Sequence, residues 1–503
     1  MGDYCGTAYG GSGTTARRLR VQCPRNCNGD HHSEHADIHA RWRRQQAAKG
    51  LAVVTRVVMA VNNAGTNDYR VVKSAEVLAA AGYEVLVVGL HSADHAPRET
   101  RNGVRYVRVA LPRSRLALLP DLVGATLWWN RLRAPIRILA HDSAASPLAD
   151  RAPAPQPGLR PRLVAWLRYC VRSFRPATSP LSVRLLFARY AHAYVPVLLA
   201  LEADIYHAHE LWMLESCALA ARARGARLVY DSHELEPHRN LDWCEASNRR
   251  RISYEERYIH AADSVFTVSP GVARQLMHIY QLPTVGLLRN TPWLARLRPA
   301  AHGLRATLGL ADDVPLVVYT GLVTLNRGLE LVVRALAALP DFHLAMVGRA
   351  ELTTAAILTN LAAELDVSAR IHAVPPVPPE ELIDFISSGD VAVIAAPDVC
   401  LSYRYSLPNK LFEALFANLP LVISDLEDMR DFVTAHGLGE VFAQGDPEAL
   451  SAALRLVVKQ RERYVDAEQR ERLRRSLSFD REAADLLSSY RKLAVHDSGV
   501  DSL

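Results

Sequence analysis

The chain has 503 residues, of which 49% are hydrophobic and 22% are charged, and this length favours two or three domains over a single core. Its 59 Lys and Arg residues against 53 Asp and Glu residues give a net charge of +6, much of it in the Arg-rich segments 16–56 and 98–188. The excess therefore does not indicate a nucleic-acid-binding stripe. It could favour an anionic membrane surface, where each cation near the bilayer contributes about 1 kcal/mol.

Cysteine spacing and hydropathy predict a cytoplasmic protein. The seven cysteines are scattered, and Cys23 and Cys27 are not followed by a second pair at zinc-ligand spacing, which is typical of a reducing compartment. No apolar stretch follows the basic residues near the N-terminus, so no signal peptide is expected. The longest apolar runs, 116–129 and 195–201, are shorter than the ~18 residues that a membrane-spanning helix needs.

The first segment of the chain, residues 1–50, is rich in Gly, Ser, Arg and His and has no strand or core pattern. This composition predicts a disordered tail. His31, His35 and His39 have the i, i+4, i+8 spacing of one helical face and could bind a metal ion. Because no cysteine or carboxylate cage accompanies them, a solvated tail is the preferred interpretation.

From Arg56 onward, apolar strand candidates alternate with helical stretches. The first series of strands is Arg56–Asn62, Glu84–Leu90, Val104–Leu111, Asp204–His209, Ala226–His233, Ser264–Ser269 and Val285–Asn290. A second series follows Pro292, with strands at Leu316–Gly321, His343–Gly348, Arg370–Val374, Val391–Ala396, Leu419–Ser424 and Glu440–Phe442. Strands without a polar face that alternate with helices indicate parallel sheets covered on both sides.

The repeated series predicts an α/β fold with two doubly wound, Rossmann-like domains, spanning residues 51–291 and 292–475. Residues 476–503 are expected to form a C-terminal helix that packs back on the first domain, followed by a tail. Residues 113–200 interrupt the first series with helical material rich in Arg, Trp and Leu. Its tryptophans and arginines could form a surface that contacts a membrane, or the insert could be a helical lid with snorkelling arginines.

Polar side chains follow four of the predicted strands, in the segments 62–68, 207–210, 231–234 and 321–328. Doubly wound sheets bind their ligands beyond the carboxyl ends of the strands. One histidine at a strand end is usually structural, but His207, His209 and His233 lie at the ends of two strands, which favours a functional role. Strand alternation places His207 and His209 on the same face.

A second candidate site is the helix that begins near Asn409. Its apolar face is formed by Leu411, Phe412, Leu415 and Phe416. Asn409, Lys410 and Glu413 lie on the opposite face. Free N–H groups at the helix start, reinforced by Lys410 and Arg404, predict an anion site, and Glu413 is placed to accept hydrogen bonds from sugar hydroxyls. The alternative is an ordinary amphipathic helix with a solvated polar face.

Taken together, these segments resemble glycosyltransferase family 4, the group 1 glycosyltransferases of the two-Rossmann-domain (GT-B) type. The matching segments occur in the family's order within residues 56–490, and they are "NDYRVVKSAEVLAAAGYEVLVV", "ADIYHAHELW", "ARLVYDSHELE", "ADSVFTVSPGVARQL", "VVYTGLVTLNRGLELVVRAL" and "SYRYSLPNKLFEALFANLPLVISD". The tail and the 113–200 insert are not covered by the resemblance.

The resemblance implies roles for particular residues. It implies that His209 contacts the donor sugar and that Arg327 and Lys410 stabilise the diphosphate, so these three are the expected catalytic residues. The donor site would also include Gly321, Leu407, Asn409 and Glu413, with Glu413 on the nucleotide ribose. The acceptor side is expected to include Asn67, Asp68, Arg70, His233 and Glu234.

Two positions depart from the family pattern. Tyr405 stands where the first of two paired glutamates is expected, and Leu322 stands where a second phosphate-binding arginine often occurs. The first departure affects how the sugar hydroxyls are held, and the second weakens the phosphate clamp unless Arg404 or Lys410 compensates. No D-x-D triplet is present, so we expect charge stabilisation of the leaving group without a metal ion.

The resemblance therefore implies a retaining glycosyltransferase that uses a nucleotide-diphosphate sugar as co-substrate, with no separate cofactor. The expected acceptor is a glycan or a lipid-linked glycan precursor, and the expected location is the cytoplasm, with peripheral contact at the inner membrane face. One alternative is a nucleotide-sugar epimerase on the same fold, which would need extra carboxylates in the cleft. Another is a catalytically inactive sugar-nucleotide-binding subunit. The departures from the family pattern at Tyr405 and Leu322 are the reason to consider it.

Overall fold

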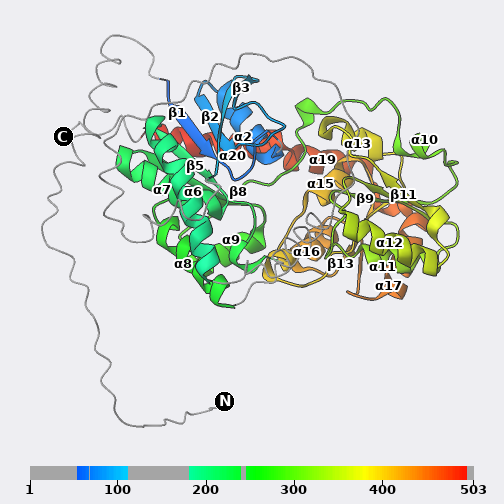
Figure 1. The fold of residues 1–503 in the computed structure, drawn as a ribbon. Helices are drawn as coiled ribbons and strands as arrows, with labels where there is room; N and C mark the ends of the chain where they lie inside the picture. Colours follow the sequence, from blue (N-terminus) through cyan, green and yellow to red (C-terminus); the bar gives the residue numbers. More distant parts are fainter. Residues whose placement is uncertain (1–53, 67, 112–179, 240–244, 496–503) are drawn as a thin grey trace, which may run out of the picture. The chain divides into compact units, whose positions relative to one another are not determined.

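The computed structural model describes residues 54–66, 68–111, 180–239 and 245–495 (Figure 1). The predicted disordered tail, most of the 113–200 insert and Asn67 lie outside the described residues. No helix in the described ranges is both long and apolar enough to cross a membrane.

The first sheet has eight strands in the order β3-β4-β2-β1-β5-β6-β7-β8. Its strands are β1 (Arg56–Ala60), β2 (Glu84–Leu90), β3 (Arg98–Arg101), β4 (Val104–Val109), β5 (Ile205–His209), β6 (Arg227–Ser232), β7 (Ser264–Thr267) and β8 (Gly286–Leu287). All neighbours pair in parallel except β3, which pairs with β4 in antiparallel. The strand order reverses between β1 and β5, which makes the crevice beyond these two strand ends the expected ligand position.

The edge strand β3 was not predicted from the sequence. Its four residues, RETR, are mostly exposed and carry no apolar alternation. The turn that joins it to β4 contains Asn102 and Gly103, both with positive φ (49° and 78°). An Asn-Gly pair of this kind favours a tight hairpin, so the dipeptide was the signal that could have revealed the strand.

The second sheet has six parallel strands in the order β11-β10-β9-β12-β13-β14. They are β9 (Leu316–Thr320), β10 (His343–Val347), β11 (Ile371–Val374), β12 (Val391–Ile394), β13 (Leu421–Ser424) and β14 (Gly439–Phe442). The order reverses between β9 and β12, as it does between β1 and β5 in the first sheet. The expected fold of two doubly wound α/β domains is confirmed.

Helices flank both sheets (Figure 1). Around the first sheet they are α2 (Tyr69–Ala80), α6 (Pro180–Ala200), α7 (Leu211–Arg224), η2 (Glu236–His238), α8 (Glu245–Ile259) and α9 (Pro270–Tyr280). The linker helix η3 (Leu294–Arg296) is followed by α10 (Leu304–Leu308), α11 (Leu329–Ala337), α12 (Leu352–Glu364), η4 (Ser368–Arg370), α13 (Pro379–Ile386), α14 (Leu401–Arg404), α15 (Asn409–Phe416), α16 (Glu427–Ala435), α17 (Pro447–Lys459), α18 (Arg461–Tyr464), α19 (Ala467–Leu477) and α20 (Phe479–Val495). Within the predicted insert, Pro180–Ala200 forms α6, which packs on α7 and α8.

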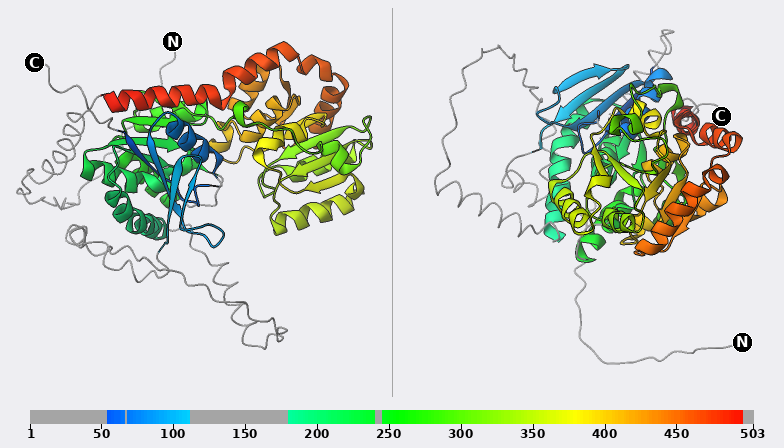
Figure 2. Two further views of the ribbon diagram at one scale, coloured as in Figure 1. Left: turned by 90° about the horizontal axis from the view of Figure 1, so that it is seen from above. Right: turned by 90° about the vertical axis from the view of Figure 1, so that its right-hand side faces the viewer.

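The last helix, α20, packs against α2 of the first domain (Figure 2). Phe479 and Tyr490 are fully buried in the core on that face of the first sheet. Glu482 of α20 forms an ion pair with Arg289, with 2.7 Å between the guanidinium Nε and the carboxylate. The Tyr490 hydroxyl lies 2.7 Å from Nδ1 of His207, so α20 contacts a side chain of β5 directly.

Candidate functional site

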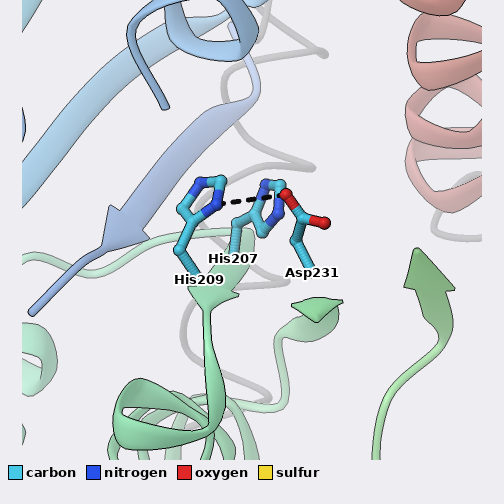
Figure 3. A group of neighbouring side chains, drawn as sticks. All are labelled: His207, His209 and Asp231. Carbon is cyan, nitrogen blue, oxygen red and sulfur yellow. Dashed lines mark ion pairs between the residues drawn. The ribbon is translucent and has the colours of Figure 1, made fainter. Parts of the chain in front are cut away.

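The carboxyl end of β5 carries two adjacent histidine side chains. His207 and His209 are both fully buried, and their rings stack with 4.1 Å between centroids and 22° between planes. The predicted placement on one face is confirmed. The register of β5 and β6 sets His209 opposite Asp231, which brings a carboxylate beside the imidazole (Figure 3).

Asp231 lies at the centre of a buried polar network. Its carboxylate accepts a 2.7 Å hydrogen bond from Nε of Arg70, and Nη2 of Arg70 binds the other carboxylate oxygen. Burial would raise the pKa of Asp231, but Arg70 and His233 outweigh it and hold the pKa well below its usual range. The structure thus places Arg70, which the family resemblance assigned to the acceptor side, in the interior with 2% of its surface exposed.

His233 and His209 complete this network. Nδ1 of His209 lies 3.3 Å from Asp231 Oδ2 and 3.1 Å from Nε2 of His233. Nε2 of His233 is also 3.3 Å from the same carboxylate oxygen, and its Nδ1 is 3.6 Å from Glu210. Burial lowers the pKa of His209. Burial also acts to lower the pKa of His233, but the two carboxylates raise it to about 10.

Asp68 joins the network from the start of α2. It caps the helix by accepting from the Val71 amide, and it also accepts a 3.1 Å hydrogen bond from the side chain of Asn63. Burial would raise the pKa of Asp68, but His233 and His209 lower it overall. The start of α2 therefore brings both Asp68 and Arg70 to the ends of β5 and β6.

His207, His209 and Asp231 are near enough to be considered as metal ligands, with one candidate atom from each lying within 4.8 Å of the others. However, the Asp231 carboxylate already binds the guanidinium of Arg70 in a two-point contact, and a buried cation beside a metal ion would oppose its binding. We therefore interpret the group as a hydrogen-bonded network.

In the second domain, the loop between β9 and α11 depends on glycine. Gly328 has φ of +71°, and a Cβ atom there would lie 1.8 Å from the carbonyl oxygen of Ala395. Gly321 has φ of +105°. Between them, the guanidinium carbon of Arg327 lies 5.6 Å from the ring centroid of Tyr403, which holds the side chain over the segment that leads to α15.

Helix α15 has the predicted apolar face, since Leu411, Phe412, Leu415 and Phe416 are at most 1% exposed. Its other face is not simply solvated. Nζ of Lys410 lies 3.7 Å from the ring centroid of Tyr319, and Glu413 accepts a hydrogen bond from the Thr320 hydroxyl. Burial, helped by Arg327, lowers the pKa of Lys410 to about 7. Burial raises the pKa of Glu413.

A cavity of about 400 Å³ brings the candidate residues of both domains together. Its lining includes His233, Glu234 and Arg239 from the first domain and Gly321, Leu322, Arg327, Leu407, Asn409, Lys410 and Glu413 from the second. His233 and Glu234, which were assigned to the acceptor side, therefore line the same cavity as the donor-site candidates. His209 is not part of this lining and sits behind His233.

The two departures from the family pattern differ in position. Leu322 lines the cavity and is 45% exposed. Tyr405 does not line it; its backbone carbonyl accepts a hydrogen bond from the Ser269 hydroxyl. Arg404, considered as a substitute cation, is bound instead to Asp398 with 2.6 Å between Nη2 and the carboxylate, and it does not line the cavity.

Sequence reasoning missed Lys73 and Arg239. Lys73 is 7% exposed, and its Nζ donates to the Thr291 carbonyl at 2.5 Å. It lines a second cavity, of about 200 Å³, that shares Asn409 and Glu413 with the first. Its position one turn after Arg70 on the same helix was the available signal. Arg239 is held by Glu234 and Glu236 at 3.0 Å each, a local ion cluster that spacing alone does not single out.

Two family models match the chain. The model described as "Glycosyl transferases group 1" matches residues 303–475, and the model described as "Glycosyltransferase Family 4" matches residues 148–287. The first match covers most of the second doubly wound domain, and the second match includes the ends of β5 and β6.

Curated relatives carry the name D-inositol 3-phosphate glycosyltransferase. The one from Thermobispora bispora is 26% identical over 270 residues, covering 50% of this chain and 61% of the relative. The one from Nocardia farcinica is 28% identical over 239 residues, covering 44% of this chain and 51% of the relative. The chain thus spans only about half to three-fifths of the length of these relatives.

Solved structures share the fold at low identity. Sucrose-phosphate synthase from Thermosynechococcus elongatus matches with a TM-score of 0.64 and 17% identity, covering 88% of this chain and 100% of that one. The Anabaena protein HepE, solved in complex with UDP-glucose, matches with a TM-score of 0.58 and 12% identity, covering 87% of this chain and 99% of that one. At these identities the likeness bears on the fold alone.

Proposed function

Because the chain belongs to the group 1 glycosyltransferases with two Rossmann-like domains, we propose that it transfers a sugar from a nucleoside diphosphate sugar to a hydroxyl acceptor. The observation that carries the proposal is the cavity of about 400 Å³, in which Arg327, Lys410 and Glu413 face His233 and Glu234. Cations at one wall suit a diphosphate, and a buried carboxylate nearby suits sugar hydroxyls.

The reaction breaks the bond between the anomeric carbon and the diphosphate oxygen, so negative charge develops on the leaving diphosphate. Arg327 and Lys410 are the groups that stabilise this charge, together with the free N–H groups at the start of α15. Lys410 lies against the Tyr319 ring, so its side-chain nitrogen is already positioned before the donor binds. No separate cofactor or metal ion takes part in this proposal.

Glu413 is assigned to the ribose of the nucleotide. It sits one turn inside α15, close to Lys410, and its carboxylate already accepts from the Thr320 hydroxyl. A third cavity, lined by Gly321, Gly348 and Arg349, also borders Glu413 and is the assigned place of the nucleobase. Structural neighbours of the same fold have been solved with UDP or UDP-glucose, so uridine nucleotides are the first donors to test.

For the acceptor, we propose a glycan or a lipid-linked glycan, with the transferred sugar keeping its anomeric configuration. Asp68, His233 and Glu234 are the first-domain groups assigned to this side, with Glu234 and His233 at the cavity wall. The curated relatives are named for a phosphorylated inositol acceptor, so polyol phosphates belong in the same acceptor panel.

Contact with an anionic membrane is also part of the proposal. Its basis is the sequence of the insert, where Trp128, Trp129, Arg131, Arg133 and Arg137 lie outside the described residues. We expect the protein to sediment with anionic vesicles at low salt, and less so at high salt or with the three arginines changed to Gln. A protein that stays in the supernatant at low salt refutes the membrane contact and favours the lid.

The test of the function is a nucleotide-sugar screen followed by product analysis. Donors that bind raise the melting temperature by mass action, which selects the substrate for the assay. We expect transfer to a glycan acceptor, together with slower donor hydrolysis when the acceptor is omitted. Conversion of the donor to an isomeric nucleotide sugar indicates an epimerase. Binding without any turnover indicates an inactive binding subunit. Neither alternative is favoured by the site.

A further inference from the structure

The buried network behind the cavity wall fixes where its protons lie. Both ring nitrogens of His233 face carboxylates, with Nε2 3.3 Å from Asp231 and Nδ1 3.6 Å from Glu210. Three carboxylates, those of Asp231, Glu210 and Asp68, act on His233, against one nearby guanidinium, that of Arg70. This surplus of negative charge favours a doubly protonated His233 ring, in agreement with its raised pKa.

The protonation of His233 determines the tautomer of His209. Nδ1 of His209 is 3.1 Å from Nε2 of His233. Because Nε2 of His233 carries a proton directed into this contact, a second N–H on His209 Nδ1 would set two donors against each other. Burial keeps His209 neutral by lowering its pKa. Its single proton therefore lies on Nε2.

That Nε2 is buried and has no hydrogen-bond partner within the described part of the chain. A buried N–H without an acceptor is costly, and such groups in native proteins usually have a functional explanation. The His209 ring cannot turn freely to relieve this, since it stacks on His207, whose Nδ1 is held by the Tyr490 hydroxyl.

Arg70 makes the arrangement rigid. Its guanidinium binds both oxygens of Asp231, and the two side chains are 3% and 0% exposed. A two-point contact sets the plane of the carboxylate, so Oδ2 points at the His209 and His233 nitrogens. Figure 3 shows Asp231 beside the stacked histidine pair, with the contact to His209 marked.

We propose that Arg70 and Asp231 are positioning residues that act through a protonated His233 to hold His209 as an Nε2–H donor. The consequence for turnover rests on the proposed glycosyl transfer, whereas the tautomer does not. Of Arg70, His209, Asp231 and His233, only His233 lines the cavity, so a ligand there meets a cation that the buried ion pair maintains.

The tautomer is tested by correlating side-chain ¹⁵N and ¹H signals of the histidines in the full chain at pH 7. We expect one histidine with both nitrogens protonated and assigned to His233, and we expect His209 to carry its proton on Nε2. Assignment uses His233→Gln and His209→Gln. Protonation of His209 on Nδ1, or a neutral His233, overturns the proposal, and this result needs no enzymatic activity.

Asp231→Asn tests the positioning role, and Asp263→Asn is its matched control. Asp263 also pairs with an arginine, Arg227 at 2.8 Å, and accepts from a backbone amide in the same sheet, but it lies away from the histidines. We expect Asp231→Asn to lose the second proton of His233 and mix the tautomers of His209. We expect it to lower kcat about 10- to 100-fold, by analogy with the loss of a hydrogen-bond partner that orients a metal-binding histidine. A smaller change is expected in donor KM.

Removing only Asp231 leaves Arg70 buried without its partner, which can prevent folding. The double variant Arg70→Met with Asp231→Asn removes both charges. It leaves no unpaired buried cation, so the positioning role can be tested even if Asp231→Asn alone does not fold. Altered tautomers with kcat no lower than in Asp263→Asn refute the positioning role. If the unchanged protein transfers no sugar to any acceptor, the proposed function fails while the tautomer result still stands.

Discussion

Lys410 offers a test in which stability and function change in opposite directions. Its ammonium lies 3.7 Å from the Tyr319 ring centroid at the cavity wall, and burial followed by the charge of Arg327 lowers its pKa from 10.5 to about 7. The protonated form is therefore disfavoured in the folded protein without ligand. A bound diphosphate would supply the missing negative charge. We expect Lys410→Met, which keeps the apolar stem, to stabilise the ligand-free protein and to weaken nucleotide binding.

The expected gain in the free energy of unfolding for Lys410→Met follows from the pKa shift of Lys410. One pKa unit corresponds to about 1.4 kcal/mol, so the full shift would correspond to about 5 kcal/mol. Because the side chain keeps part of its surface in the open cavity, we expect about half of that, or roughly 2–3 kcal/mol.

The pKa shift of Lys410 also predicts how the stability of the protein changes with pH. A folded pKa below the unfolded one means that the unfolded chain binds more protons between pH 7 and pH 10.5, so the stability of the unchanged protein rises with pH across that window. The advantage of Lys410→Met should accordingly be largest near pH 7 and should disappear as the pH approaches 10.5.

The assay is urea denaturation at pH 7 and pH 10, with calorimetry of UDP binding at pH 7. Lys459→Met, at an exposed lysine in the same domain, is the control and should change neither quantity. If Lys410→Met is no more stable than the unchanged protein at pH 7, burial of the Lys410 ammonium does not destabilise the folded protein. If UDP binds with unchanged affinity, the diphosphate does not contact Lys410.

Three further predictions concern the second domain. Arg327→Ala should cost about 2–4 kcal/mol in transition-state stabilisation, measured as kcat/KM, and near-normal turnover at saturating and subsaturating donor would place the diphosphate elsewhere. Glu413→Gln should raise donor KM far more than it lowers kcat, the pattern of lost uniform binding, and unchanged nucleotide affinity by calorimetry would contradict the ribose assignment. Gly328→Ala should prevent stable folding of the β9–α11 loop, because its Cβ would lie 1.8 Å from the Ala395 carbonyl oxygen. Gly437→Ala, at φ of +56° with no atom within 4 Å, should cost only about 1 kcal/mol in a melting experiment, and equal losses would contradict the steric argument.

The fold was largely predictable because its strands are buried on both faces. Strands such as β1, β9 and β12 are continuous apolar runs with nearly complete burial, and runs of this kind indicate parallel sheets whatever their neighbours. The exposed strand β3 has no such signature, since it is stabilised by its hairpin partner and not by burial. Strand pairing order was not predicted, because apolar runs do not encode which strand lies beside which.

The site was predictable only in part, for a related reason. Strand alternation correctly predicted that His207 and His209 lie on one face of the sheet, but it does not predict which side chains pack against that face. The cover comes from Arg70, 161 residues before its partner Asp231, and from Tyr490, 283 residues after His207. Contacts at such separations depend on how α2 and α20 pack, and no local pattern records them. The family resemblance assigned Arg70 to the first-strand loop on the acceptor side, whereas the structure has it in the first turn of α2, in the interior.

Topology explains why these distant residues meet. In the first sheet the order reverses between β1 and β5, so the chains leaving these neighbouring strands run to opposite faces and leave a crevice at their carboxyl ends. The loop after β1 and the first turn of α2 bring Asp68 and Arg70 to that crevice, and the end of β5 brings His209. The second sheet reverses between β9 and β12, which brings the glycine-dependent loop of Arg327 to the segment before α15. In each domain the polar groups gather where the winding direction changes, so the positions of the candidate residues follow from strand order more than from any single motif.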